Sequence, residues 1–216
     1  MNVDKGQKSL LAGFYRSHHL AGDRLDQSFL EKERGSLFSE WIGTGKKVLD
    51  LGGRDGTLTK YFVARNDVTI GDIDPNALES AHVNLGVDTE FVNLNDTLPF
   101  NSGTFDTVVM AEVLEHLPYP RITLGEITRI LRPGGQFVGN FPIAYHLKDR
   151  YRVLRGKKLV MAGDKTHLQF FTYDEALELL GDFFDIDNIE ILKGGRAGKR
   201  YPRLFARNIA FNCTKK

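Results

Sequence analysis

Cysteine is almost absent from this 216-residue sequence, and long apolar runs are missing. The single cysteine, Cys213, has no partner for an internal disulfide and no CxxC neighbour for zinc, so no metal is expected and a reducing compartment suits the chain. No apolar run approaches the roughly 20 residues of a membrane span, and the first 20 residues lack the apolar stretch of a signal peptide. These absences predict a soluble, cytoplasmic protein.

A strong net charge is also lacking, because the formal charge is only +1. Residues 1–140 nevertheless contain 14 Lys and Arg against 19 Asp and Glu, and residues 141–216 contain 15 against 9. The pI of 7.8 lies below the value of about 9 that marks nucleic-acid-binding domains, so nucleic acid is not an expected partner. The basic second part leaves two interpretations open, an acidic partner or a solvated basic face.

Short apolar runs alternate with longer amphipathic ones over the middle of the chain. The runs that read as strands are 46–52, 68–74, 88–94, 105–112 and 134–142. Helices are predicted between them at 57–65, 75–85 and 121–131. This alternation predicts one α/β domain with a parallel sheet covered on both faces, and a ligand at the carboxyl ends of the strands.

The flanking parts of the sequence follow other patterns. A polar, basic and irregular segment runs from 142 to about 171 and precedes a helix at 173–184. Two last strands, 184–193 and 204–214, are joined by a loop that suits an antiparallel hairpin. Two helices, about 6–20 and 26–42, are expected to form an N-terminal cap at 1–45 before a core domain at 46–216.

The first turn after a strand, "DLGGRDG", combines Gly52, Gly53 and Gly56 with Asp50 before them. Glycines allow positive φ and close approach of a ligand, and a following helix N-terminus offers N–H donors. Asp72 ends the second strand 20 residues after Gly52, where a carboxylate can accept hydrogen bonds from both hydroxyls of a ribose. The pattern indicates a site for a nucleotide-like cofactor.

Four ordered motifs extend this signal: "VLDLGGRDG", "GDIDP", "NDTLPFNSGTFDTVVMAEVLEHL" and "ITRILRPGGQFVGNFP". Over about 46–142 the sequence resembles the class I S-adenosylmethionine-dependent methyltransferases, in particular small core-domain members of the type 11 and 23 kind. The resemblance implies S-adenosylmethionine as cofactor and S-adenosylhomocysteine as product. It also implies a Rossmann-like, doubly wound sheet of seven strands, mostly parallel with an antiparallel last strand.

The resemblance further implies roles for individual residues. Asp50 would lie near the methionine amino group and Asp72 would hold the ribose, while the remaining cofactor contacts would come from Gly52, Gly53, Arg54, Gly56, Ile73, Asn93, Leu94 and Ala111. Arg54 stands where the family has its middle glycine. With negative φ its side chain could leave the pocket or reach the cofactor carboxylate, whereas positive φ would impose a strain of about 1 kcal/mol.

Residues beyond the fourth strand are predicted to face the methyl acceptor. His116 is a candidate general base, with Glu112 as a second candidate, although a structural role of His116 in capping or packing a short helix is the favoured alternative. Tyr145, His146 and His167 are further acceptor-side candidates, each with packing as the alternative. No metal site is predicted.

The function expected from these residues is methyl transfer to an oxygen of a small or carbohydrate-type acceptor. The basic segments 146–158 and 193–203 suggest that this acceptor is acidic, if both emerge at the carboxyl edge of the sheet. Two alternatives remain, a non-catalytic binding module with the same fold and a nicotinamide-dependent oxidoreductase. The GxGxxG spacing of the latter does not match Gly52 and Gly56.

Overall fold

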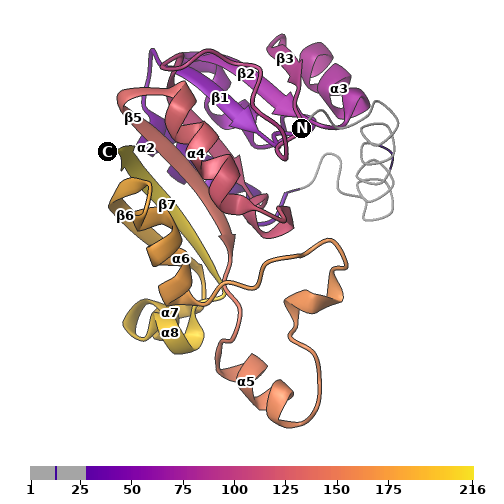
Figure 1. Ribbon diagram of the computed structural model, residues 1–216, viewed down its shortest axis with the longest axis vertical. Coiled ribbons are helices and arrows are strands. Elements are labelled where there is room, and N and C mark those ends of the chain that lie inside the picture. Colours follow the sequence, from indigo (N-terminus) through magenta and orange to yellow (C-terminus); the bar gives the residue numbers. More distant parts are fainter. Residues whose placement is uncertain (1–12, 14–27) are drawn as a thin grey trace.

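The computed structural model describes residue 13 and residues 28–216, and its strands form one seven-stranded sheet in the order β3-β2-β1-β4-β5-β7-β6 (Figure 1). The strands are β1 (Lys47–Leu51), β2 (Asp67–Asp72), β3 (Asp88–Phe91), β4 (Phe105–Ala111), β5 (Leu131–Pro142), β6 (Phe184–Lys193) and β7 (Asn208–Lys215). The longer helices are α2 (Glu31–Ile42), α3 (Pro75–Leu85), α4 (Pro120–Ile130), α5 (Leu147–Leu154) and α6 (Tyr173–Gly181). Shorter helical turns are η1 (Thr59–Tyr61), η2 (Val63–Arg65), η3 (Leu114–His116), η4 (Met161–Gly163), α7 (Gly195–Arg200) and α8 (Pro202–Phe205).

Strand directions confirm the predicted fold class. The first five strands pair in parallel, and β7 pairs antiparallel with both β5 and β6. The strand order reverses between β1 and β4, which form the switch point of the doubly wound sheet. A ligand crevice is expected at the carboxyl ends of these two strands.

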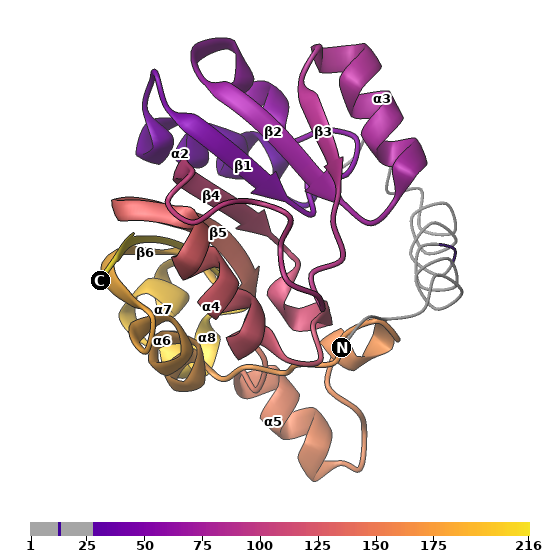
Figure 2. The same cartoon turned by 45° about the horizontal axis from the view of Figure 1, so that its top comes forward.

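Helices cover both faces of the sheet, as Figures 1 and 2 show with α4 in front of it and α2 behind. Successive residues of each central strand alternate between the two apolar clusters beneath these helices, because side chains of a strand point to opposite faces. In β4, Val108 packs on the α4 and α6 side and Val109 on the α2 and α3 side. The sheet is therefore buried on both faces, which explains the near-continuous apolar runs of its strands.

The prediction of an α-helix at 57–65 is wrong, because this stretch contains the two 3-10 turns η1 and η2 instead. Phe62 interrupts them with φ −127° and ψ −8°. The side-chain amide of Asn66 donates to the carbonyl oxygen of Phe62 at 2.9 Å, and this oxygen would accept the Asn66 backbone N–H in an α-helix. A side chain thus competes with the backbone for the helical hydrogen bond.

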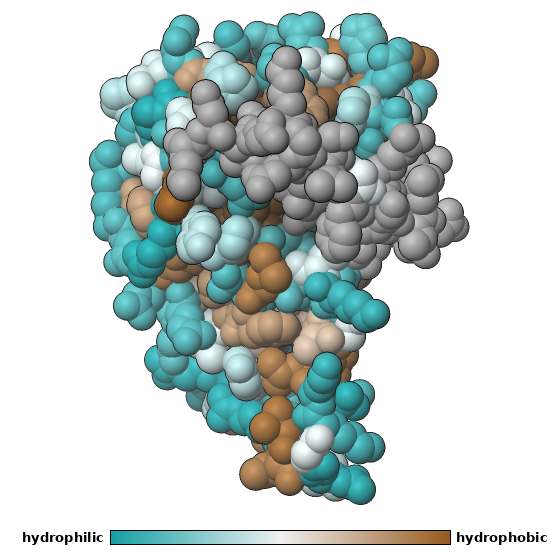
Figure 3. Space-filling model, turned by 45° about the vertical axis from the view of Figure 1, so that its right-hand side comes forward, coloured by the Kyte–Doolittle hydropathy of each residue, from teal (hydrophilic) through white to brown (hydrophobic). Residues whose placement is uncertain are grey.

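The segment 142–171, predicted as irregular, contains α5 and η4. The ring of His146 accepts a hydrogen bond from the backbone N–H of Asp149 and caps α5, a role more usual for Ser, Thr, Asp or Asn. This unusual cap left no recognisable start signal in the sequence. Beyond the cap, the exposed side chains of Leu147, Tyr151 and Leu154 lie among basic residues, and Figure 3 shows apolar patches within the hydrophilic surface of this projecting part.

The predicted hairpin of the last two strands is confirmed, but its connection differs from the expected loop. It contains α7 and α8, and β7 begins at Asn208. Pro202 occupies the first turn of α8, where its missing N–H costs nothing.

Two predictions concern the N-terminal part. The helix predicted at 6–20 lies outside the described residues, and the one predicted at 26–42 is described as α2. Phe38 and Ile42 of α2 pack in the same apolar cluster as Val48 and Val138 of the sheet. The division into a cap at 1–45 and a core at 46–216 stays a prediction.

Among the described helices, none has the length and apolar character needed to cross a bilayer. Cys213 is buried in β7, and burial raises the pKa of its thiol to about 12, so this cysteine is an unreactive core residue. The reducing, cytoplasmic compartment stays a prediction.

The close packing of β5 between β4 and β7 generates a test of the fold. A Cβ on Gly139 would lie 2.1 Å from the backbone oxygen of Met110 and 2.6 Å from Cζ of Phe211. Because the backbone cannot move away, Gly139→Ala should lower the free energy of unfolding by about 3 kcal/mol or more, measured by urea denaturation. Gly181→Ala, at the end of α6 with nothing within 4 Å, should change it by less than about 0.5 kcal/mol. Equal effects would contradict the packing.

Candidate functional site

A cavity of about 460 Å³ opens at the switch point of the sheet. Every residue of the predicted cofactor set except Gly56 lines it, and so do Glu112, His116 and His167 from the predicted acceptor side. The structure therefore brings together residues that lie more than 100 positions apart in the sequence. Tyr145 and His146 are not among the lining residues.

The glycines of the first turn are required by close contacts and by backbone conformation. Gly52 has φ +75°, and a Cβ there would lie 2.5 Å from a methyl group of Val113. Gly56 has φ +79°, and a Cβ there would lie 2.4 Å from Cδ1 of Leu85. Gly56 thus allows the conformation of the turn and its close packing against Leu85, although it does not line the cavity.

Arg54 adopts the strained alternative left open by the sequence, with φ +50°. Its backbone N–H donates to Oδ2 of Asp72 at 3.0 Å, which holds the turn in this conformation. Arg54 lines the cavity, so the residue in the place of the middle glycine is part of the site. A charge-assisted hydrogen bond of this kind offsets a strain of about 1 kcal/mol.

Asp72 links the first two turns of the sheet. Its Oδ1 accepts the backbone N–H of Asp74 at 2.9 Å, while Oδ2 accepts that of Arg54. The side chain is buried at the cavity wall beside Ile73. Two backbone donors therefore fix the orientation of the carboxylate before any ligand binds.

Asn93 lies in the cavity wall, but its amide serves the local turn. Oδ1 accepts from both the backbone N–H and the side-chain amide of Asn95 at 3.1 Å, and Nδ2 donates to Asp96 at 3.1 Å. The neighbouring Leu94 also lines the cavity. The sequence alone did not reveal that the Asn93 amide is engaged in this way.

Asp50 is buried at the floor of the cavity, where Oδ2 accepts the hydroxyl of Thr59 at 2.6 Å. The pKa of this carboxyl is raised to about 6, mainly by burial and in smaller part by the nearby Asp72, while the Thr59 hydrogen bond and Arg54 act in the opposite direction. A cationic group bound next to this buried carboxylate would favour its ionised form.

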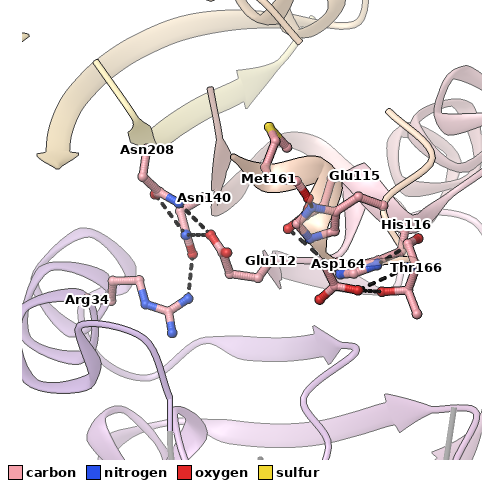
Figure 4. A network of polar contacts seen from close by, with 10 residues as sticks. Arg34, Glu112, Glu115, His116, Asn140, Met161, Asp164, Thr166 and Asn208 are labelled. Carbon is pink, nitrogen blue, oxygen red and sulfur yellow. Dashed lines mark hydrogen bonds and ion pairs between the residues drawn. The ribbon is translucent and has the colours of Figure 1, made fainter. Parts of the chain in front are cut away.

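A polar network on the acceptor side joins Glu112, directly after β4, to the three elements α2, β5 and β7 (Figure 4). Oε1 of Glu112 accepts from the side-chain amides of Asn140 in β5 and Asn208 in β7, the latter at 2.6 Å. The buried Arg34 of α2 donates to Oδ1 of Asn140 at 2.9 Å. Glu112 itself has φ +57°. The network holds Glu112 in this strained conformation and connects α2 to the sheet.

His116 and His167 lie next to each other on the same side, with ring centroids 4.8 Å apart. Glu115, next to His116 in η3, is fully buried. Burial raises the pKa of the Glu115 carboxyl well above its usual range, and Glu112 adds to this effect. Glu115, like Arg34, was missed by the sequence reasoning, although its spacing of three from Glu112 in "EVLEHL" is a usable signal.

Tyr145 and His146 take other positions. Tyr145 has φ +59° and a partly exposed side chain at the turn after β5. His146 caps α5 and lies 3.3 Å from Oδ2 of Asp149, and it lines a separate pocket with Lys193 and Arg207. Because α5 turns away from the switch point, neither reaches the cavity with His167.

A doubly wound sheet with a glycine turn, a strand-end aspartate and a cavity at the switch point defines an α/β protein that binds a nucleotide-type cofactor. A family model described as a methyltransferase domain matches residues 23–183, and the chain belongs to this family. The predicted class, an S-adenosylmethionine-dependent methyltransferase, is therefore confirmed.

Curated relatives agree with this family. The chain is 34% identical over 147 residues to a ubiquinone biosynthesis O-methyltransferase of Aromatoleum aromaticum, covering 63% of this chain and 62% of the relative. It is 34% identical over 114 residues to the protein of the same description from Thiobacillus denitrificans, covering 48% and 49%. The chain thus spans about half to two thirds of the length of these relatives.

Solved structures share the fold. The YcgJ protein of Bacillus subtilis superposes with a TM-score of 0.65 at 14% identity, covering 86% of this chain and 99% of that protein. Geranyl diphosphate C-methyltransferase from Streptomyces coelicolor, solved with Mg²⁺, geranyl diphosphate and S-adenosylhomocysteine, gives 0.64 at 13% identity, covering 87% and 81%. These likenesses establish the fold of the chain.

Because the pKa of Asp50 is raised, its ionised carboxylate is expected to lower the free energy of unfolding at high pH but not at low pH. A folded-state pKa of about 6, above the ordinary 3.8, means that Asp50 favours folding when protonated and that this contribution is lost as pH rises through 6. Asp50→Asn should therefore raise the free energy of unfolding at pH 8 by about 1–3 kcal/mol and have little effect at pH 4. Urea denaturation at both pH values measures this, with Asp67→Asn at the exposed start of β2 as control. An equal effect of Asp50→Asn at both pH values would contradict the prediction.

Proposed function

We propose that this protein transfers a methyl group from S-adenosylmethionine to a hydroxyl oxygen of a small, acidic acceptor. The single observation that carries the proposal is the continuity of the switch-point cavity from Asp50 and Asp72 to His116 and His167. One cavity therefore has room for a cofactor at the strand ends and for an acceptor beside η3.

The residues of the first two turns fit the cofactor. Asp72 would accept hydrogen bonds from the ribose hydroxyls, and the buried Asp50 would face the cationic amino group of the methionine part. Arg54 would pair with the cofactor carboxylate, while Ile73 and Leu94 would pack on the adenine. S-adenosylmethionine supplies an electrophilic methyl group when it is bound.

The acceptor side suits an oxygen nucleophile. Nδ1 of His116 lies 3.1 Å from the carbonyl oxygen of Thr166, so Nδ1 carries the proton and Nε2 is the basic nitrogen. A hydroxyl group in the cavity could lose its proton to this nitrogen. Much of the remaining catalysis would come from aligning the oxygen with the S–CH₃ bond and excluding water. The names of the curated relatives, ubiquinone biosynthesis O-methyltransferases, support oxygen as the methylated atom.

An acidic acceptor is supported by the two basic segments. Pro142 pairs with Asn208, and Asn208 with Lys193, so the segments that follow β5 and β6 emerge at the same edge of the sheet. Lys148, Lys193 and Arg207 line one pocket between them. A carbohydrate-type or phenolic molecule with a carboxylate or phosphate would match this edge.

Cofactor binding tests the first half of the proposal. Titration calorimetry with S-adenosylhomocysteine should give a micromolar Kd for the wild-type protein. Asp72→Ala should weaken binding at least tenfold, because charged hydrogen bonds of roughly 1.5–3 kcal/mol are lost. Asp67→Ala, at the other end of β2, should bind as the wild type does. Failure of the wild-type protein to bind would overturn the proposal and favour a non-catalytic module of the same fold.

Acceptor selectivity tests the second half. Radiolabelled S-adenosylmethionine is incubated with hydroxylated phenols and sugars, each supplied with and without a carboxylate or phosphate. The acidic member of each pair should react faster at low salt, and Lys193→Ala with Arg207→Ala should raise its KM about fivefold, as expected for charges at the rim of a site. Lys32→Ala on α2 is the control. Equal rates for acidic and neutral members would exclude the acidic acceptor but leave O-methylation standing.

A further inference from the structure

Three side chains with metal-ligating atoms converge on the acceptor side of the cavity. Glu115, His116 and His167 each offer one such atom, and all three atoms lie within 4.8 Å of one another. Nε2 of His116 is 3.9 Å from Oε1 of Glu115. No metal was predicted from the sequence, in which the lone cysteine has no CxxC partner. His167 also lies 51 positions from His116, and no spacing motif joins them.

The carboxylate of Glu115 is an independent indication that a ligand binds at this cluster. Its side chain is fully buried, and neither carboxylate oxygen has a hydrogen-bond partner in the described part of the chain. A buried carboxylate without a partner is costly, and buried charges in native proteins are paired or coordinate metals. Glu112 and Asp164 add negative charge around Glu115. The surroundings thus favour a cation.

The two histidines are oriented as metal ligands are. Nδ1 of His116 faces the carbonyl oxygen of Thr166, and Nδ1 of His167 faces that of Met161, each at 3.1 Å. Both rings therefore carry their proton on Nδ1, which leaves Nε2 as the coordinating nitrogen. Metal-bound histidines usually donate their other N–H to a carbonyl or carboxylate in this manner.

The position of His167 is fixed by the backbone. The N–H groups of Leu168 and Gln169 both donate to the carbonyl oxygen of Glu115, at 2.8 and 2.9 Å. These bonds tie the segment after η4 directly to η3. The three ligands are thus held together by the main chain, and His167 stays beside Glu115 in the absence of a metal.

We propose that Glu115, His116 and His167 bind one divalent transition-metal ion. Two imidazoles and one carboxylate suit Zn²⁺, Co²⁺ or Mn²⁺, with remaining positions open to the cavity. Bonds of about 2.0–2.2 Å place ligand atoms about 3–4 Å apart, so the longest separation in the cluster, up to 4.8 Å, has to shorten by about 1–2 Å.

The consequence for the reaction rests on the proposed O-methylation. An acceptor hydroxyl at an open position of the metal would have its pKa lowered and would lose its proton to water at neutral pH. The metal would then generate the oxygen nucleophile, and His116 would act as a ligand instead of a general base. The proposed metal site would thus explain why the acceptor needs a hydroxyl group, since that group would bind the metal.

Metal binding is tested first without any acceptor. Metal-free protein is titrated with CoCl₂, ZnCl₂ and MnCl₂ by calorimetry, and Co²⁺ is also followed by its visible absorption. One equivalent of metal should bind, and the Co²⁺ bands should report nitrogen and oxygen ligands. Glu115→Gln and His167→Gln, each checked for folding by circular dichroism, should bind at least tenfold more weakly. His82→Gln, an exposed histidine of α3, should bind as the wild type does.

The possible outcomes separate the two proposals. No binding of any of the three ions at millimolar concentration, or binding that both site variants retain, would overturn the metal site. Metal bound at the site without methyl transfer to any acceptor would count against the proposed function only. Methyl transfer that survives complete chelation would confirm the function and overturn the metal's part in activating the acceptor.

Discussion

The carboxylate of Asp72 is the interaction on which the geometry of the site depends. It receives the backbone N–H groups of Arg54 and Asp74, which belong to the turns after β1 and after β2. Two adjacent strands of the parallel sheet are thereby locked together at the edge where the cavity opens. Without this acceptor, two amide groups near the cavity would lose their partner and the left-handed turn at Arg54 would lose its support. The clamp therefore sets the turns after β1 and β2 relative to each other.

Local patterns predicted the sheet, and most of the residues that they assigned to the first two turns line the switch-point cavity. Apolar runs bounded by glycine or proline identify strands without knowledge of the fold, and the strand end at Asp72 follows from the same pattern. The positive φ of Gly52 and Gly56 is also a local signal. What could not be predicted depends on contacts distant in sequence. The bond from Arg34 to Asn140 joins residues 106 positions apart, and the position of His167 beside Glu115 depends on backbone bonds between η3 and a loop 52 residues later.

Two residues that line the cavity lower the stability of the fold. Asp50 and Glu115 are buried carboxyl groups whose pKa values are raised mainly by that burial, so both make the folded state less stable at neutral pH than apolar residues of the same size would. The opposing contribution comes from the core, where Phe137, Phe141 and Phe211 pack with ring centroids 4.9–5.6 Å apart. A sequence optimised for stability alone would replace these two carboxyl groups by apolar residues, and this chain retains both of them.

The place of β7 in the sheet has a consequence for synthesis. β7 lies between β5 and β6 but follows both in the chain, so β6 has no strand to pair with until β7 has left the ribosome. β5, whose other neighbour is β4, meanwhile presents an open edge with the apolar side chains of Phe137 and Phe141. Nascent chains that stall before residue 208 would expose this edge to other chains, which is the usual origin of aggregation in sheets. Completion of the core thus coincides with the synthesis of β7, the last of the seven strands of this sheet.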